Sequence, residues 1–439
     1  MTEINYITVQ EGLDKIKDGM HVVTGLGCSE AQAMLTQIHT ISDRINQIRI
    51  SNCLSMVDYE FMHEEYSGKF LLASWFYSRG IQGMHDRGDA TFIPNNLHLA
   101  GEHFLATNTP DIYIGACSSI DKHGYVSLST GNTYERKMMD AADIVILETN
   151  PNYPRTFGDV QVHYSEVDFF IQADHKVPEL PVVEPKEKDE IIGKYIADFI
   201  NDGDCIQLGI GGIPNAVAKS LYGKKDLGVH TEMLTAEVAK LAKAGVITGK
   251  NKQSEKGKIV TTFIMGDQEL YDFVDDNPAV MVLDGNYVNN PYNIAKNDNQ
   301  VSINTTLEVD LTGQCASESI GSRQFSGTGG QVDTVRGANY SKGGRSFIAL
   351  YSTYMKKDPV TGERVETSKI VSQLTPGAAV TLQRNDVDYL VTEYGVAHLK
   401  GKNSFERIKS IINIAHPKFR DELLQQAIDI GLIGEHHAV

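Results

Sequence analysis

The chain has few cysteines and no long apolar run, and these features exclude several common classes of protein. Its 439 residues include five cysteines that lie far apart, and no Cys-x-x-Cys pair exists to form a zinc site of that type. An odd, scattered set of cysteines fits a reducing compartment. No stretch reaches the roughly 18 apolar residues of a membrane span, and the N-terminus lacks a basic start followed by an apolar run. We therefore predict a cytoplasmic protein that binds neither a membrane nor a metal.

Basic side chains are also in the minority. The chain has 40 Lys and Arg against 57 Asp and Glu, which gives a formal net charge of -17. Nucleic-acid-binding proteins carry basic stripes that release counterions from phosphate, so this balance argues against that class. The absence of a Gly-x-Ser-x-Gly elbow disfavours a serine hydrolase. The composition is ordinary for a soluble globular protein, and the net charge does not exclude a phosphorylated small ligand.

One composition shift divides the chain. The stretch Ala173–Glu190 holds three prolines and a charge run without periodicity, which is typical of a linker between domains. It separates a domain at residues 1–183 from a domain at residues 188–439. In both halves, short β-branched strands alternate with amphipathic helices, a pattern that predicts parallel sheets covered on both faces. The fold class is therefore α/β, with two open domains whose sheets are mainly parallel.

The predicted elements follow that alternation. The strands are predicted within residues 20–27, 48–54, 111–118, 142–150, 204–212, 227–233, 279–285, 345–351 and 387–395, and the helices within 29–42, 213–223 and 235–245.

A glycine turn follows the first strand of the second half. In "IQLGIGGIPNAVAKSL" the strand leads into Gly209, Gly211 and Gly212, and Pro214 is predicted to open a helix, a position where its missing N–H costs nothing. Glycines let the backbone approach a ligand, and a helix N-terminus attracts an anion. The pattern lacks the third glycine of the dinucleotide fingerprint. An ordinary tight turn without a ligand is the alternative.

Glu232 in "GVHTEML" lies one βαβ crossover after that turn. Consecutive strands of a parallel sheet are often neighbours, and ligands bind where the strands end. Glu232 would then face the backbone N–H groups of the glycine turn, an arrangement that suits a nucleophile beside an oxyanion site. The alternative is a carboxylate in the first turn of a helix, favoured there by the helix dipole.

Five stretches resemble one family. They are "IQLGIGGIP", "HTEM" and the segments Glu148–Ile171, Ser319–Leu350 and Val387–Leu423. Together and in this order they are similar to the acetyl-CoA hydrolase/transferase family, in particular to its butyryl-CoA:acetate and 4-hydroxybutyrate CoA-transferases. The resemblance implies two open α/β domains of the CoA-transferase type with the active site between them. It also implies a homodimer or homotetramer.

The resemblance assigns roles to particular residues. It makes Glu232 the catalytic nucleophile, with Gln207 lining the catalytic pocket. Coenzyme A is then a co-substrate, and no cofactor is permanently bound. The positions implied to contact coenzyme A are Gly209, Ile210, Gly211, Gly212 and Ile213 in the first loop and Gly327, Gly329 and Gly330 in "SGTGGQ".

The implied function is the exchange of coenzyme A between a short-chain acyl-CoA, such as butyryl-CoA, and acetate, through a glutamyl anhydride and a glutamyl-CoA thioester. The alternatives are an acyl-CoA hydrolase of the same family and a non-catalytic coenzyme A- or nucleotide-binding protein. Relatives that act on 4-hydroxybutyrate carry a histidine in the first glycine turn, where this chain has Gly25–Cys28. The nearest histidine, His21, is predicted to be structural, so the acyl specificity stays open.

Other candidates each have a plain structural alternative. Lys342 or Arg336 would reach the coenzyme A phosphates, or would belong to a solvated loop. Arg155 would pair with a substrate carboxylate or hold the domain interface. Glu393 is a rival nucleophile or part of a turn at the end of a strand. Cys28 lies near a glycine turn, but no histidine at a convincing spacing partners it.

Overall fold

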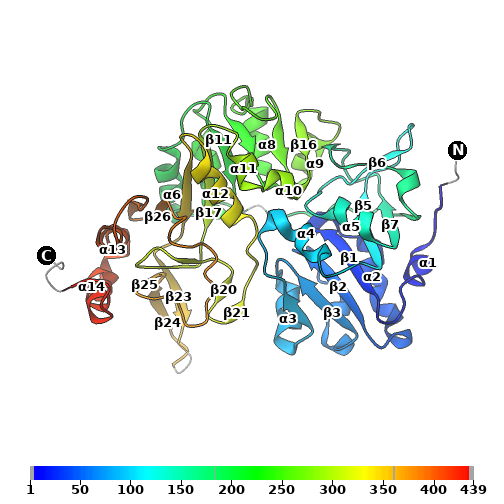
Figure 1. Cartoon of the computed structure of the whole chain (residues 1–439), viewed down its shortest axis with the longest axis horizontal. Helices are drawn as coiled ribbons and strands as arrows, with labels where there is room; N and C mark the ends of the chain where they lie inside the picture. Colours follow the sequence, from blue (N-terminus) through cyan, green and yellow to red (C-terminus); the bar gives the residue numbers. More distant parts are fainter. Residues whose placement is uncertain (1–3, 182, 359–360, 435–439) are drawn as a thin grey trace.

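The computed structural model describes residues 4–181, 183–358 and 361–434, and it has two α/β lobes built from consecutive parts of the chain (Figure 1). The first lobe, coloured blue to cyan, holds a seven-stranded sheet, and the second, green to red, holds a nine-stranded sheet. This architecture confirms the predicted fold class of two α/β units with mainly parallel sheets.

All neighbouring strands of the first sheet are parallel. In spatial order they are β10 (Phe169–Gln172), β7 (Ile144–Thr149), β5 (Ile112–Cys117), β1 (His21–Leu26), β2 (Ile48–Cys53), β3 (Phe70–Ser74) and β4 (Ala90–Phe92). The central strands β1 and β5 are buried along their whole length, as expected where both faces are covered. The helices of this lobe are α1 (Val9–Leu13), α2 (Gln32–Gln37), α3 (Arg79–Arg87), α4 (Ala100–Leu105) and α5 (Glu135–Ala141).

The second sheet is parallel except at one edge, where the last two strands form an antiparallel pair. In spatial order its strands are β27 (Gly395–His398), β26 (Tyr389–Thr392), β22 (Arg345–Ala349), β17 (Gln300–Thr305), β11 (Cys205–Leu208), β12 (Gly228–His230), β14 (Ile259–Thr261), β16 (Val280–Val282) and β8 (Phe157–Gly158). The edge strand β8 comes from the first half of the chain and pairs with β16. The two halves are therefore joined by a shared sheet as well as by the linker.

The helices of the second lobe surround this sheet. They are α6 (Glu187–Ala197), α7 (Gly212–Ser220), α8 (Ala236–Lys243), α9 (Gln268–Val274), α10 (Gly285–Val288), α11 (Pro291–Ile294) and α12 (Gln331–Tyr340). Beyond them, α13 (Ser404–Asn413) and α14 (Arg420–Asp429) pack with β18 (Glu308–Asp310) and β25 (Ile370–Val371) around a separate small core. Two exposed strands, β23 (Thr353–Lys357) and β24 (Arg364–Ser368), form a hairpin beside it.

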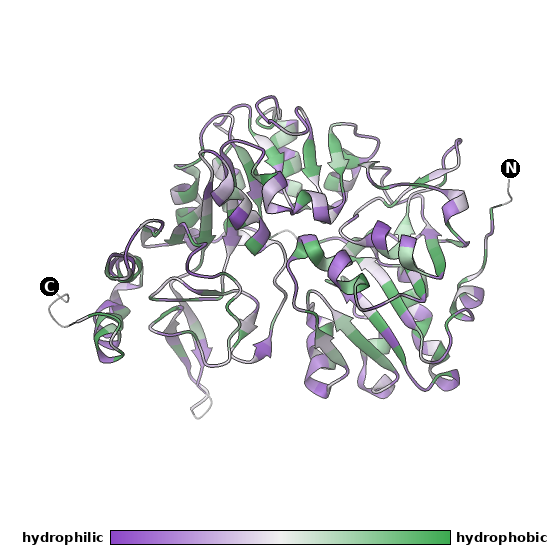
Figure 2. Cartoon of the chain, in the orientation of Figure 1, coloured by the Kyte–Doolittle hydropathy of each residue, from purple (hydrophilic) through white to green (hydrophobic). Residues whose placement is uncertain are grey.

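One hydrophobic core runs from the first sheet into the second. It includes Leu26 and Cys53 of the first lobe and Ile206, Phe263 and Met265 of the second, all nearly or fully buried. A second core fills the other face of the first sheet. Figure 2 shows hydrophobic residues along the strands of both sheets. The continuous core fixes the two lobes against each other and so fixes the geometry of anything that lies between them.

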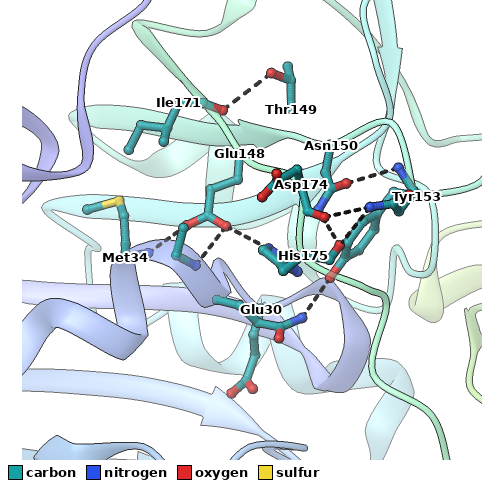
Figure 3. A network of polar contacts seen from close by, with 12 residues as sticks. Glu30, Met34, Glu148, Thr149, Asn150, Tyr153, Ile171, Asp174 and His175 are labelled. Carbon is teal, nitrogen blue, oxygen red and sulfur yellow. Dashed lines mark hydrogen bonds and ion pairs between the residues drawn. The ribbon is translucent and has the colours of Figure 1, made fainter.

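The predicted linker is extended and firmly attached at its start. Residues 173–181 and 183–186 contain no helix or strand, and α6 begins at Glu187. Figure 3 shows His175 beside the buried Glu148, whose carboxylate accepts hydrogen bonds from the backbone N–H groups of Ala33 (3.0 Å) and Met34 (2.7 Å). His175 Nε2 lies 3.3 Å from Glu148 Oε2. A buried carboxylate thus joins the N-terminus of α2 to the start of the linker.

Two predicted helices differ from those observed. The helix within residues 29–42 is α-helical only over Gln32–Gln37 and continues as a 3-10 helix over Ile38–Arg44. Its second half is rich in β-branched and polar residues, which have a weak preference for the α-helix. Helix α7 begins at Gly212 rather than at Pro214, so the proline occupies the third helical position. The first N–H groups of a helix have no internal partner, and a proline is tolerated there as well.

Among the helices of the described residues, none is long and apolar enough to cross a membrane.

Candidate active site

A cavity of about 290 Å³ lies between the two lobes. The first lobe contributes apolar side chains to its wall, among them Leu26, Leu54, Phe76 and Leu97. The second lobe contributes the polar ones, including Gln207, Glu232 and Asn304. A small, mostly apolar space with a few converging polar groups is the usual form of a small-molecule site.

The backbone of Glu232 is held where two strands meet. The residue lies between β12 and β13 (Met233–Leu234), and α8 begins only at Ala236, so the interpretation as a first-turn helix carboxylate is wrong. The Glu232 carbonyl accepts hydrogen bonds from the N–H groups of Thr262 (3.0 Å) and Phe263 (3.2 Å). These hydrogen bonds between strands, and not those of a helix, hold the backbone of Glu232 so that its side chain lies at the cavity.

The carboxylate of Glu232 accepts one hydrogen bond from the described residues. Asn289 Nδ2 donates to Oε2 at 2.7 Å. Burial raises the pKa of Glu232 to about 7, the hydrogen bond from Asn289 opposes this, and the negative charge of Asp333 adds to it. An anion held with few donors is a better nucleophile than a fully solvated one, because less solvation must be lost on attack.

A glycine loop lies directly over this carboxylate. A Cβ atom on Gly330 would come within 1.6 Å of Glu232 Oε2, and one on Gly329 within 3.9 Å of Oε1. Gly329 also has a φ of +55°, which favours glycine. The loop ends at Gly330, the N-cap of α12, so a helix N-terminus also faces the carboxylate. The structure thus brings the "SGTGGQ" glycines and Glu232 together.

The same loop bridges the lobes. Ser326 O accepts from Tyr77 N–H at 3.3 Å, and Phe325 O accepts from Gln82 Nε2 at 2.9 Å. A Cβ on Gly327 would lie 2.3 Å from Trp75 O, so only glycine allows this approach. The contacts hold the loop closed over the cavity.

Gln207 lines the cavity at the end of β11 with a fixed orientation. Its Oε1 accepts from Ser302 Oγ (3.0 Å), Ile303 N–H (3.1 Å) and Asn304 Nδ2 (3.3 Å). No described residue accepts a hydrogen bond from its Nε2. The anchored amide therefore has an N–H₂ group free for a ligand in the cavity.

The first glycine loop is brought to the site only in part. Gly209, Ile210 and Pro214 line the cavity, whereas Gly211, Gly212 and Ile213 do not. Gly211 is the N-cap of α7 with a φ of 110°. A Cβ on Gly212 would lie 2.4 Å from Asp189 Oδ2, so this glycine packs against the start of α6.

Several candidates lie outside the cavity. The side chain of Lys342 is 88% exposed and lies 3.8 Å from Asp298, beyond the end of α12 opposite to Gly330. Arg336 pairs with Asp386 at 3.0 Å, and Arg155 pairs with Asp121 at 2.7 Å.

Glu393 and Cys28 also have structural roles. Glu393 accepts from Lys188 Nζ (2.8 Å) and from the N–H of Ser352 (2.9 Å), and so ties α6 to the sheet. Burial raises the pKa of the Cys28 thiol to about 12 despite a hydrogen bond with Tyr271, which removes it as a thiolate nucleophile.

Three residues of the site have no signal in the sequence. Asn289 lies 57 positions beyond Glu232 and follows α10. Asp333, in the first turn of α12, accepts from His98 Nδ1 (2.8 Å) and from His98 N–H (3.1 Å) in the first lobe. Only the fold brings these segments together, so spacing along the chain could not predict them.

The described residues, 4–181, 183–358 and 361–434, contain no group of three or more His, Cys, Asp or Glu that could hold a metal ion. The chemistry that the cavity can carry without one is nucleophilic attack by a carboxylate beside amide and backbone donors.

Several known proteins are similar to nearly the whole chain, among them the following two. The 4-hydroxybutyrate coenzyme A transferase of Clostridium kluyveri is 41% identical over 96% of this chain and 96% of its own length. The probable butyrate:acetyl-CoA coenzyme A-transferase of Syntrophomonas wolfei is 38% identical over 96% of this chain and 94% of its own length.

Among solved structures, that of RipA from Yersinia pestis superposes with a TM-score of 0.89. It is 35% identical and covers 98% of each chain. Residues 3–184 match the acetyl-CoA hydrolase/transferase N-terminal domain, and residues 266–427 match the corresponding C-terminal domain. Both the predicted family and the prediction of an enzyme are confirmed: this chain belongs to the acetyl-CoA hydrolase/transferase family.

Proposed function

We propose that the enzyme transfers coenzyme A between short-chain carboxylic acids, with a short-chain acyl-CoA such as butyryl-CoA as donor and acetate as acceptor. The observation that carries this proposal is the carboxylate of Glu232, held in the cavity between the lobes with Asn289 as its one donor in the described part of the chain. The names of the two relatives described above support the reaction class, because one is called a 4-hydroxybutyrate coenzyme A transferase and the other a probable butyrate:acetyl-CoA coenzyme A-transferase.

The first half-reaction releases the donor acid. A Glu232 oxygen attacks the thioester carbonyl, the C–S bond breaks, and coenzyme A leaves as a thiolate with an acyl-glutamyl anhydride behind it. The thiolate then attacks the glutamyl carbonyl. The bond between the glutamyl carbonyl carbon and the bridging oxygen breaks, the donor acid leaves as its carboxylate, and Glu232 becomes a glutamyl-CoA thioester.

The second half-reaction reverses these steps with the acceptor acid. Its carboxylate attacks the glutamyl carbonyl and expels the thiolate, and the thiolate attacks the acyl carbonyl of the new anhydride. The products are the new acyl-CoA and the free Glu232 carboxylate. Each attack creates an oxyanion, and the Gln207 and Asn289 amides and the N–H groups of the glycine loops are the donors near it. One such donor lowers the activation free energy by about 3–4 kcal/mol.

Transfer must exclude water, because hydrolysis would waste the thioester. The apolar wall from the first lobe and the loop that bridges the lobes support transfer over hydrolysis. The test is to follow acyl-CoA consumption and free coenzyme A release with and without acetate. A transferase consumes acyl-CoA only when the acceptor is present and shows ping-pong kinetics. Equal release of free coenzyme A in acetate-free buffer would identify a hydrolase instead.

A further inference from the structure

A second cavity, of about 420 Å³, lies in the first lobe and shares no wall residue with the cavity at Glu232. Its floor is the face of the first sheet that carries His21 on β1, Arg49 on β2 and Leu71 on β3. Phe104 of α4 and Trp75 form its apolar side.

Three side chains of this cavity carry polar atoms without a partner among the described residues. Arg49 is exposed at the cavity, and its guanidinium forms no hydrogen bond or ion pair with any described residue. The Asn95 amide oxygen and nitrogen and His21 Nδ1 are buried without a hydrogen bond among the described groups. An unpaired buried polar group costs about 1–3 kcal/mol, and such groups in native proteins call for a specific explanation.

The unpaired groups can together hold a negative charge. His21 is 3% exposed, and burial together with the nearby Arg49 charge lowers its pKa to about 4, so the ring is neutral near pH 7. Its Nε2 lies 2.8 Å from Ser51 Oγ. With Ser51 as donor there, the ring carries its hydrogen on Nδ1. A guanidinium, an imidazole N–H and an amide N–H₂ are donors that a carboxylate accepts.

The rest of the wall defines the class of ligand. No acidic side chain lines the cavity, which argues against a cation, and Leu71, Trp75 and Phe104 offer apolar contact. The volume is at the small end of the range for small-molecule sites. The combination of one cation, a few donors and an apolar wall fits a small organic carboxylate.

The two cavities are adjacent through two short segments. Trp75 lines the second cavity, and its neighbour Phe76 lines the first. Likewise Asn95 lines the second and Leu97 the first, and His98 follows with its bonds to Asp333. We propose that the second cavity is a binding site for a small organic carboxylate, anchored at Arg49, on the segments that form the wall of the catalytic cavity. This proposal does not depend on the proposed function.

The single tryptophan of the chain makes the proposal testable without an assay of turnover. Trp75 is 4% exposed and lines the second cavity, so ligand binding should change its fluorescence. We expect butyrate to give a saturable change in the full-length protein, and the neutral analogue butyramide to give none. Arg49→Gln should weaken butyrate binding at least ten-fold, whereas Glu232→Ala should leave it unchanged. Arg364→Gln, an exposed arginine on the β23–β24 hairpin, is the matched control.

Three results would overturn the proposal. They are the absence of a saturable response to butyrate, an unchanged titration in Arg49→Gln, and loss of the response in Glu232→Ala, which would assign it to the catalytic cavity. Sedimentation of wild type and Arg49→Gln adds a fourth. If Arg49→Gln forms an assembly of different mass from that of the wild type, this face is covered by a second copy of the chain rather than by a carboxylate. Arg49→Lys, which keeps the charge, should retain part of the binding and so separates a lost anchor from misfolding.

Discussion

Gly330→Ala tests the geometry of the site most sharply, because the backbone of Gly330 tolerates alanine. Its φ of -96° is ordinary for any residue, so the substitution adds no backbone strain. Its added Cβ would instead lie 1.6 Å from Glu232 Oε2 and 2.3 Å from Asn289 Nδ2, where an ordinary contact begins at 3.4 Å. The loop, the carboxylate and its amide donor cannot all keep their places.

The expected loss of activity follows from that displacement. The separation from Glu232 Oε2 would have to grow from 1.6 Å to about 3.4 Å, and a misplacement of about 1 Å can cost 100-fold in rate. We therefore expect kcat/KM for acyl-CoA to fall at least about 100-fold, or about 2.7 kcal/mol. The rate of acetyl-CoA formation from butyryl-CoA and acetate measures it.

The control is Gly223→Ala, where an added Cβ meets nothing within 4 Å. It should keep the wild-type rate, and thermal unfolding should show both variants folded. A folded Gly330→Ala enzyme within ten-fold of wild type would refute the placement of the loop against Glu232.

Further predictions concern charge and stability. The kcat/KM for acyl-CoA should rise about ten-fold per pH unit below about pH 7 and level off above it, because Glu232 attacks as the anion; a flat profile would contradict this. Asp333→Asn should move the midpoint to lower pH, because the Asp333 charge raises the pKa of Glu232; Asp284→Asn, which breaks the Lys137 ion pair instead, should not. Asn289→Ala should move the midpoint upward and slow turnover, since it removes the one donor to Glu232 among the described residues; a downward shift would count against that role. Burial lowers the pKa of His175, but the hydrogen bonds to Glu148 and the Lys176 carbonyl and the charges of Glu148 and Asp174 together outweigh it, so the pKa is raised. The stabilisation is therefore full below pH about 6.5 and is lost as the pH rises through the folded pKa. His175→Ala should therefore cost more stability in urea at pH 5.5 than at pH 8.5, and equal losses would contradict the pairing.

Much of the fold could be predicted from local patterns. The strands at Ile112–Cys117 and Ile144–Thr149 are bounded by polar residues and are buried except at the partly exposed Ile144, a pattern that is typical of parallel strands. The crossover from Gly209 to Glu232 follows the same logic, since β11 and β12 are neighbours in the sheet. The elements that were not predicted depend on distant contacts. Strand β8 has only two residues and exists because β16 lies beside it.

The residues of the site also divide into those that the sequence predicts and those that only the fold brings together. Glu232, Gln207 and the glycines of both loops belong to stretches whose spacing or family resemblance points to them. Asn289 and the His98–Asp333 pair became visible only when the fold joined segments that are 57 and 235 positions apart. Lys342 shows the opposite case, since a basic residue among glycines suggests phosphate binding, yet its side chain lies exposed away from the cavity.

The central claim is that Glu232 forms a covalent bond to coenzyme A. Borohydride reduces a glutamyl thioester to an alcohol, so the measurement is mass spectrometry of the peptide that contains Glu232 after incubation with acyl-CoA and then borohydride. We predict inactivation that requires acyl-CoA, with the Glu232 carboxyl group converted to an alcohol and no such change in Glu232→Ala, which should also be inactive. Full exchange activity in Glu232→Ala, or reduction at another residue, would contradict the account.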